Sequence, residues 1–247
     1  MSRDAGAGVT SLLEEEVPVE QTPMTQGVRL RTTLILFGPP GSGKGTQANL
    51  LKECLQVPHI STGDMLRDRI ASGDPLGLKV SALMAAGRLV PDEIVNQLVD
   101  DRIAQPDCGQ GFILDGYPRT IAQAQVMERK LEQSGFAQVV IHLKVDYTSI
   151  IARLTGRRQC PKCGSLYSLT SNPPKQADRC DLDGTPLMIR EDDRESVIRE
   201  RLEAYDRQTH PLLEYFSASG HPFHEVDGMS DSPQVIVKRI CDLLATE

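Results

Sequence analysis

The sequence contains no tryptophan, and aromatic residues supply only 4% of it. Aromatic rings form the platforms on which nucleic-acid bases stack, so the composition does not favour a single-strand binder. The formal net charge of −7 also argues against a broadly basic surface, although a local basic cleft is compatible with it. We therefore expect no nucleic-acid partner.

Long apolar runs are also missing, and none is long enough to span a membrane. The N-terminus lacks the basic-then-apolar order of a signal peptide. Six cysteines, three of them clustered, do not resemble a secreted disulfide framework in a chain of this length. The expectation is a cytoplasmic protein with no membrane partner.

The chain's 247 residues can bury a sizeable core, as one domain with insertions or as two small ones. Residues 1–28 are small, polar and acidic without an apolar period, and we expect them to form a flexible leader. From Thr32 onward, strands alternate with helices. This order predicts an α/β fold with a parallel sheet, helices on both faces, and ligands at the carboxyl ends of the strands.

Apolar runs and turn residues locate the individual elements. The expected strands are 32–37, 111–114, 139–143 and 222–226. Two helix starts are more specific: Pro91 is expected at the first position of a helix that ends at Ile103, and Asp192 and Glu195 are expected to form a capping box. The capping box would begin one long helix over residues 195–216.

A glycine-rich loop dominates the sequence: Phe37-Gly38-Pro39-Pro40-Gly41-Ser42-Gly43-Lys44-Gly45-Thr46. It lies between an expected strand and an expected helix, which is the setting of a phosphate-binding loop. Glycines let the backbone approach the phosphates closely, and the helix N-terminus favours negative charge. Lys44 adds a point charge that can reach the β- and γ-phosphates. We expect residues 41–46 to bind ATP.

The position of the hydroxyl residue is unusual, because Gly45 separates Lys44 from Thr46. The form G-P-P-G-S-G-K-G-T-Q resembles the nucleoside monophosphate kinases, and the adenylate kinase family in particular. Two further motifs are similar to that family's AMP-binding segments: Ser61-Thr62-Gly63-Asp64-Met65-Leu66-Arg67 and Asp115-Gly116-Tyr117-Pro118-Arg119-Thr120. The resemblance runs from about residue 32 to 245, in register and without large gaps.

The resemblance implies a Mg²⁺-dependent, reversible transfer, ATP + AMP ⇌ 2 ADP, with these nucleotides as the partners of a monomer. It implies a P-loop three-layer α/β/α core with a helical insertion that binds the nucleoside monophosphate and a small β-rich lid. The core would comprise residues 29–60, 91–156 and 194–247. The AMP-binding domain would comprise residues 61–90, and the lid residues 157–193.

The resemblance also assigns side chains. The residues implied to contact ATP, besides the P-loop residues Gly41, Ser42, Gly43, Lys44, Gly45 and Thr46, are Arg153, Arg157, Leu166 and Tyr167, with Arg153 stacked on the adenine. The residues implied to contact AMP are Thr62, Arg67, Arg88, Leu89, Val90, Gly116, Tyr117, Pro118, Arg119, Gln123, Arg190 and Arg201. The residues implied to act on the transferring phosphoryl group are Lys44, Arg119, Arg157, Arg190, Arg201 and Asp115. Gln123 would read the base with its amide; otherwise it would be an ordinary exposed helix residue.

Asp115 ends a strand of the same expected sheet as the P-loop, where a carboxylate can hold Mg²⁺ through coordinated water. Asp64 is a second candidate for the same role.

The clustered cysteines form two similar knuckles. Cys160-Pro161-Lys162-Cys163-Gly164 is followed by Cys180-Asp181-Leu182-Asp183-Gly184, in which Asp183 takes the position of the second cysteine. No histidine lies in this insertion, so Cys160, Cys163, Cys180 and Asp183 would complete a structural zinc site. Such a site resembles the metal-containing lids of some bacterial adenylate kinases. Free thiols or a Cys160–Cys163 disulfide are the alternatives, whereas Cys54, Cys108 and Cys241 are expected to be ordinary thiols.

Two other functions remain open. A cytidylate or uridylate kinase is the closest competitor, although its lid is usually short. An ATP-gated binding module, whose zinc knuckle grips nucleic acid or a partner, is the non-enzymatic alternative. It predicts a basic stripe around the knuckles, but this segment carries Asp178, Asp181, Asp183, Glu191, Asp192 and Asp193. A GTPase is disfavoured because the chain has no Asn-Lys-x-Asp guanine motif.

Overall fold

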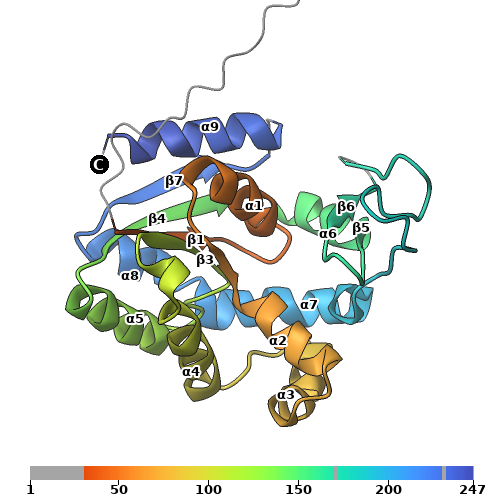
Figure 1. Ribbon diagram of the computed structural model, residues 1–247, viewed down its shortest axis with the longest axis horizontal. Coiled ribbons are helices and arrows are strands. Elements are labelled where there is room, and N and C mark those ends of the chain that lie inside the picture. The colour runs from red at the N-terminus through yellow and green to blue at the C-terminus, as the bar shows by residue number, and fades with distance from the viewer. Residues whose placement is uncertain (1–30, 170–171, 230–231, 247) are drawn as a thin grey trace, which may run out of the picture.

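The computed structural model describes residues 31–169, 172–229 and 232–246. The expected leader over residues 1–28 lies outside these described residues. At the centre is a five-stranded sheet in the order β2-β3-β1-β4-β7 (Figure 1). Its strands are β1 (Thr32–Phe37), β2 (His59–Ser61), β3 (Gly111–Asp115), β4 (Ala137–Lys144) and β7 (Phe223–Asp227). All four pairings are parallel, which confirms the predicted α/β class.

One face of the sheet is covered by α1 (Lys44–Leu55) and α9 (Pro233–Leu244), which lie above the strands in Figure 1. Leu34 and Leu36 of β1 point to this face and pack in one cluster with Leu51 of α1 and Ile240 of α9. The neighbouring residues of β1, among them Ile35, belong to the cluster on the opposite face. This alternation along a buried strand divides the apolar core between two faces.

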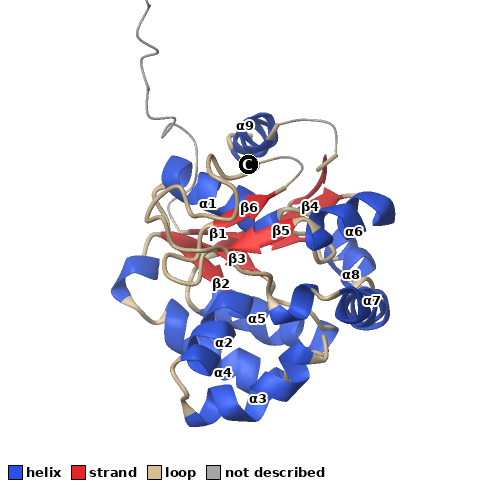
Figure 2. Ribbon diagram, turned by 90° about the vertical axis from the view of Figure 1, so that its right-hand side faces the viewer, coloured by secondary structure: helices blue, strands red, loops and turns tan. Residues whose placement is uncertain are grey.

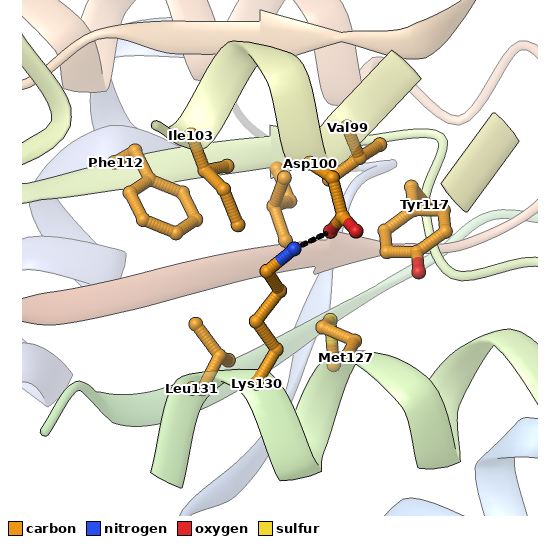
Figure 3. Close-up of a pocket in the computed structure, with 9 residues that line it drawn as sticks. Val99, Asp100, Ile103, Phe112, Tyr117, Met127, Lys130 and Leu131 are labelled. Atoms are coloured by element: carbon orange, nitrogen blue, oxygen red, sulfur yellow. Dashed lines mark ion pairs between the residues drawn. The ribbon is translucent and has the colours of Figure 1, made fainter. Parts of the chain in front are cut away.

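The opposite face is covered by α4 (Asp92–Ile103), α5 (Ile121–Gln133) and α8 (Leu212–Ala218). Figure 2 shows α4 and α5, with α2 and α3, below the strands, so the core has three layers. A cavity of about 10 Å³ lies between α4 and α5. Figure 3 shows Phe112 and Tyr117, which line it, and the ion pair of Lys130 with Asp100 at its border. That volume admits about one water molecule, so this cavity is not a substrate site.

Residues 61–90 form two helices, α2 (Thr62–Ala71) and α3 (Pro75–Ala85), that project from the carboxyl end of β2. Each begins with a side-chain cap, because Asp64 N donates to Ser61 Oγ, and Leu76 N and Gly77 N donate to Asp74 Oδ1. A Cβ on Gly77 would lie 2.1 Å from Arg69 O. Only glycine therefore permits the close contact between these two helices.

Beyond α6 (Tyr147–Thr155), the chain enters a small antiparallel pair, β5 (Arg157–Gln159) and β6 (Leu166–Ser168). Figure 1 shows this segment at the end of the molecule away from α5. The chain returns through a bridge between Gln159 and Met188 and a 3₁₀ turn, η2 (Glu191–Asp193). The short 3₁₀ helix η1 (Pro106–Cys108) lies elsewhere, just before β3.

Three local predictions were wrong. The expected long helix over 195–216 is divided into α7 (Glu195–Ala204), a π-helical turn η3 (Tyr205–Thr209) and α8, with Pro211 at the N-cap of α8. No capping box forms, because Arg194 is the N-cap of α7 and its side chain makes no capping hydrogen bond. Asp192 instead pairs with arginines, as described below. Pro91 is the N-cap of α4 and not its first helical residue.

Helices that could cross a membrane are absent from the described ranges.

Candidate active site

The glycine-rich loop connects β1 to α1, as its sequence predicts. Gly38, Gly41 and Gly43 have φ angles of +144°, +84° and +98°, which residues with a Cβ atom rarely adopt. Space is short as well, since a Cβ on Gly41 would lie 2.9 Å from Leu154 Cγ. The loop therefore needs glycine for its backbone conformation and for its packing against α6.

Lys44 is the first residue of α1 and folds back over the loop. Its Nζ donates to Gly38 O at 2.7 Å and to Pro39 O at 2.9 Å. Burial is the main reason that the pKa of Lys44 is lowered to about 8; Asp115 opposes the shift, and nearby arginines contribute to it. A lysine held in this way is a fixed positive charge beside the backbone N–H groups of a helix start.

Five arginines from distant parts of the chain lie close enough to Lys44 or to one another that their positive charges repel. We call these residues the cationic cluster: Lys44, Arg67, Arg119, Arg157, Arg190 and Arg201. Burial lowers the pKa of Arg119 to about 10 and that of Arg190 to about 9, and like charges add to both shifts. Arg119 and Arg190 remain charged at neutral pH despite these shifts. The cluster is therefore a concentrated positive field suited to anionic phosphates.

Two neighbouring carboxylates hold part of this cluster in place. Asp193 is 3% exposed and accepts from Arg157 Nε at 2.7 Å and from Arg201 Nη1 at 2.8 Å. Asp192 Oδ2 lies 3.1 Å from Arg201 Nη1 and 3.8 Å from Arg67 Nη1. Burial would raise the pKa of Asp192, but Arg201 and Arg67 hold it below its usual value. These ion pairs orient the guanidinium groups before any phosphate arrives.

Arg119 is positioned by its own segment. Its Nε donates to Gly116 O at 2.8 Å, and its carbonyl accepts from Thr209 Oγ1 at 2.9 Å. Thr62 is 2% exposed and also donates to Gly116 O, at 2.8 Å. The two AMP-binding segments expected from the sequence therefore meet at the carbonyl of Gly116.

Asp115 ends β3 next to the P-loop, and its Oδ2 would lie 3.4 Å from a Cβ on Gly45. His59 lies on its other side, with Nε2 at 3.5 Å from the same oxygen and Nδ1 at 3.1 Å from Asn49 Oδ1. Burial would raise the pKa of Asp115, but His59 and Lys44 hold it below its usual value. The sequence reasoning missed His59, for which the only signal is its position directly before the Ile60-Ser61-Thr62-Gly63-Asp64 motif.

The residues expected to contact AMP differ in how far the structure exposes them. Gln123 is 1% exposed, so the alternative of an exposed helix residue is wrong. Its Nε2 donates to Asp92 Oδ1 at 2.8 Å, and its Oε1 accepts from Arg119 N at 2.7 Å. Arg88 is exposed, and Val90 is buried in the apolar cluster on the sheet face that α4, α5 and α8 cover. Their contacts with a nucleotide stay predictions, as do those of Leu89, Gly116, Tyr117 and Pro118.

Of the residues expected to contact ATP outside the P-loop, some lie near the loop and one side chain faces away from it. Arg153 of α6 donates to Ser42 O at 3.3 Å and to Gly228 O at 2.7 Å, so its guanidinium lies beside the P-loop. Leu166 Cδ1 would lie 3.9 Å from a Cβ on Gly45. The Tyr167 side chain faces away, because it is buried with Cys160 and Cys180. A contact of Tyr167 with ATP therefore stays a prediction about its backbone.

The two cysteine knuckles face each other at the far end of the β5–β6 pair. Cys160, Cys163, Cys180 and Asp183 each offer a ligand atom, and these atoms all lie within 4.8 Å of one another. The backbones match: Gly164 N donates to Cys160 O at 3.0 Å, and Gly184 N donates to Cys180 O at 2.9 Å.

The spacing of these ligand atoms fits a tetrahedral zinc ion. The Sγ atoms of Cys163 and Cys180 are 3.5 Å apart, and Cys160 Sγ lies 3.5 Å from Asp183 Oδ2. A tetrahedron with ordinary zinc–ligand bond lengths has edges of roughly 3.5–3.8 Å. Backbone and side-chain hydrogen bonds from Thr185 lower the pKa of Asp183, which keeps it ionised as a ligand must be. The residues present therefore fit a structural metal site.

The family model described as adenylate kinase matches residues 36–221. This range includes the P-loop lysine, the cationic cluster and both cysteine knuckles.

Relatives named "Adenylate kinase" cover most of the chain. The protein from Syntrophotalea carbinolica is 48% identical over 199 residues, which is 80% of this chain and 92% of that protein. The protein from Methanocella arvoryzae is 48% identical over 202 residues, or 81% and 93% of the two chains. The protein from Pseudothermotoga lettingae is 50% identical over 185 residues, or 74% and 85%.

Proposed function

The chain belongs to the adenylate kinase family of phosphotransferases, and on this premise we propose that it catalyses ATP + AMP ⇌ 2 ADP with Mg²⁺. The observation that carries this proposal is the cationic cluster. Its six side chains come from α1, α2, the β3–α5 loop, β5, the segment just before η2 and α7, yet their charges interact. A site for one nucleotide needs fewer cations than a site in which two sets of phosphates must meet.

The reaction moves the γ-phosphoryl group of ATP to an α-phosphate oxygen of AMP. The bond between the γ-phosphorus and the bridging oxygen breaks, and a new phosphorus–oxygen bond forms to AMP. Because the attacking oxygen is already anionic, the protein needs no strong base. Its contribution is to align the two nucleotides and offset their repulsion.

Lys44 and the N–H groups at the start of α1 would hold the β- and γ-phosphates of ATP. Arg153 lies beside Ser42 and Gly228, where it would stack on the adenine. Gly41, Ser42, Gly43, Gly45 and Thr46 would supply the rest of the phosphate cradle. Leu166 and Tyr167 would complete the ATP site from the lid.

AMP would bind between the two segments that meet at Gly116 O. Arg67 and Arg119 would hold its phosphate, and Thr62 and Gln123 would contact its adenine. The Gln123 amide is already paired with Asp92 and Arg119 N, so base recognition would use its remaining hydrogen-bonding capacity. Arg157, Arg190 and Arg201 would face the transferring phosphoryl group, where a planar guanidinium can bind oxygens in pairs.

Asp115 and Asp64 would hold Mg²⁺ through coordinated water. When bound, Mg²⁺ neutralises the phosphates of ATP and the charge that develops on them during transfer. Asp115 suits this role because it is kept ionised beside Lys44 and His59.

The lid over residues 157–193 and the AMP-binding domain over residues 61–90 would exclude water, since water in the site would hydrolyse ATP. Residues 29–60, 91–156 and 194–247 would form the core on which both are mounted. Cys160, Cys163, Cys180 and Asp183 would hold a structural zinc ion in the lid. Its role would be to fold a segment whose own buried cluster comprises Cys160, Tyr167 and Cys180. We further propose a cytoplasmic monomer.

A panel of nucleoside monophosphates offered with ATP and Mg²⁺ tests this function. ADP formation should be fastest with AMP and much slower with CMP and UMP. A preference for a pyrimidine monophosphate would overturn the choice of substrate. Lys44→Met should abolish turnover with a circular dichroism spectrum unchanged, whereas Lys52→Met, an exposed residue of the same helix, should remain active.

A further inference from the structure

Two cysteines outside the candidate active site lie in contact although 187 positions separate them in sequence. Cys54 is in the last turn of α1, and Cys241 is in the last half of α9. Their Sγ atoms are 3.3 Å apart. A disulfide bond has a length of about 2.05 Å, so the two sulfur atoms need to approach by only about 1 Å.

We propose that Cys54 and Cys241 form an oxidisable thiol pair that a peroxide converts into a disulfide joining α1 to α9. Both side chains lie in the interface between these helices, on the face of the sheet that contains Leu34 and Leu36. Most of the side chains packed around them are apolar, and among the described residues each sulfur atom has only the other as its hydrogen-bonding partner.

The step balances with hydrogen peroxide as the oxidant. The Cys54 thiolate attacks one peroxide oxygen, the O–O bond breaks, and the products are a sulfenic acid and hydroxide. Cys241 then attacks the Cys54 sulfur, loses its proton and displaces the sulfenic oxygen, which leaves as water. Two thiols and one peroxide thus give one disulfide and two waters.

The exposure of the two residues assigns these roles. Cys54 is partly exposed and can meet the oxidant, whereas Cys241 is 7% exposed. Burial raises the pKa of Cys241 to about 12, which disfavours this thiol as the first to react. Cys241 is therefore the residue that resolves the sulfenic acid.

The other cysteines are poorer candidates. Cys108 is fully buried, and its sulfur contacts Arg102 and Asp107 but no second sulfur in the described part of the chain. Cys160, Cys163 and Cys180 form the proposed metal site, where a bound ion would protect them.

The disulfide would close a loop of almost the whole folded core and stabilise it against unfolding. Cys54 lies at the end of α1 opposite to Lys44, so the bond would join the C-terminal helix to the core without altering the phosphate-binding loop. Oxidation would then increase resistance to heat and leave turnover unchanged. Oxidation of a thiol that contacts substrate would instead be expected to lower turnover.

The test treats the purified, metal-loaded protein with stoichiometric hydrogen peroxide and maps its peptides by mass spectrometry without reduction. We expect a mass loss of two hydrogens, a peptide pair linked through Cys54 and Cys241, and a melting temperature that rises by roughly 5–10 °C. Dithiothreitol should reverse the rise. The rate of ADP formation should change by less than twofold.

Cys54→Ser and Cys241→Ala should each abolish the linked peptide and the shift in melting temperature. Cys108→Ser is the matched control, and it should retain both. The linked peptide is measured in the unaltered chain, so the result does not depend on the folding of any variant. Oxidation of the exposed Cys163 without a Cys54–Cys241 link would overturn the proposal, as would a link that leaves the melting temperature unchanged.

Discussion

Arg190 Nη2 lies 3.5 Å from Asp64 Oδ1, so the N-cap residue of η2 is paired with the first turn of α2. Asp64 also accepts from Arg67 Nη2 at 2.6 Å, and Arg190 Nε donates to Gln159 Oε1 at 2.6 Å. One carboxylate and one guanidinium thereby connect three segments that the chain keeps far apart. Burial would raise the pKa of Asp64, but Arg67 and Arg190 hold it below its usual value.

Replacing Arg190 tests this connection. Arg190→Lys keeps the charge but loses the planar group that binds Gln159 and Asp64 at once. We expect kcat to fall by roughly 10–100-fold while the melting temperature changes by only a few degrees. Steady-state kinetics of ADP formation measure the effect. Arg199→Lys, on the exposed side of α7, is the matched control, and an equal loss in both variants would contradict the assignment.

The pKa of Lys44 predicts how activity depends on pH. Phosphate binding needs the protonated amine, and burial lowers the pKa of this amine from 10.5 to about 8. Its charged fraction therefore falls as the pH rises through 8, and kcat/KM for ATP should fall about tenfold for each further pH unit. The value of kcat should fall less, because bound phosphates raise the pKa of Lys44.

Lys44→Arg supplies the control for this titration. A guanidinium stays charged throughout the same range, so the residual activity of this variant should lose the alkaline decline. A wild-type profile of kcat/KM that stays flat up to pH 10 would show that Lys44 does not titrate as its burial indicates.

The proposed zinc site predicts a separation of stability from activity. Cys160→Ser removes one thiolate ligand from a lid with few buried apolar side chains. We expect the melting temperature to fall by roughly 5–15 °C while activity at moderate temperature stays within a fewfold of the original. Lys162→Ala, an exposed residue of the same knuckle, should change neither quantity. Metal analysis of protein purified without chelator should find one zinc per chain, and its absence would refute the site.

The contact between His59 and Asp115 predicts an effect on the metal requirement. His59→Ala removes the ring whose Nε2 lies 3.5 Å from Asp115 Oδ2 and which helps to keep the pKa of Asp115 low. The Mg²⁺ concentration for half-maximal activity should rise by roughly tenfold. His59→Gln, which can still donate a hydrogen bond, should restore most of the affinity. An unchanged Mg²⁺ dependence in His59→Ala would assign His59 to the fold alone.

Local patterns in the sequence determined much of this protein. The apolar run of β1, the glycines of the loop and Lys44 follow one another directly, so their geometry depends on neighbours in the chain. The same holds for each cysteine knuckle, where two ligands and a glycine lie within five residues. These features were readable because backbone conformation and short-range hydrogen bonds produce them.

Only the tertiary structure decided which distant groups meet. Asp192 was expected to cap a helix, but it lies among arginines from other elements, whose charges stabilise it more than a free N–H group would. Gln123 was expected to contact a base with its amide, and only the fold showed that this amide also pairs with Asp92. The contact of Cys54 with Cys241 had no sequence signal, because it arises where two helices pack on the same face of the sheet. Such contacts depend on the packing of the whole core, which no short stretch of residues specifies.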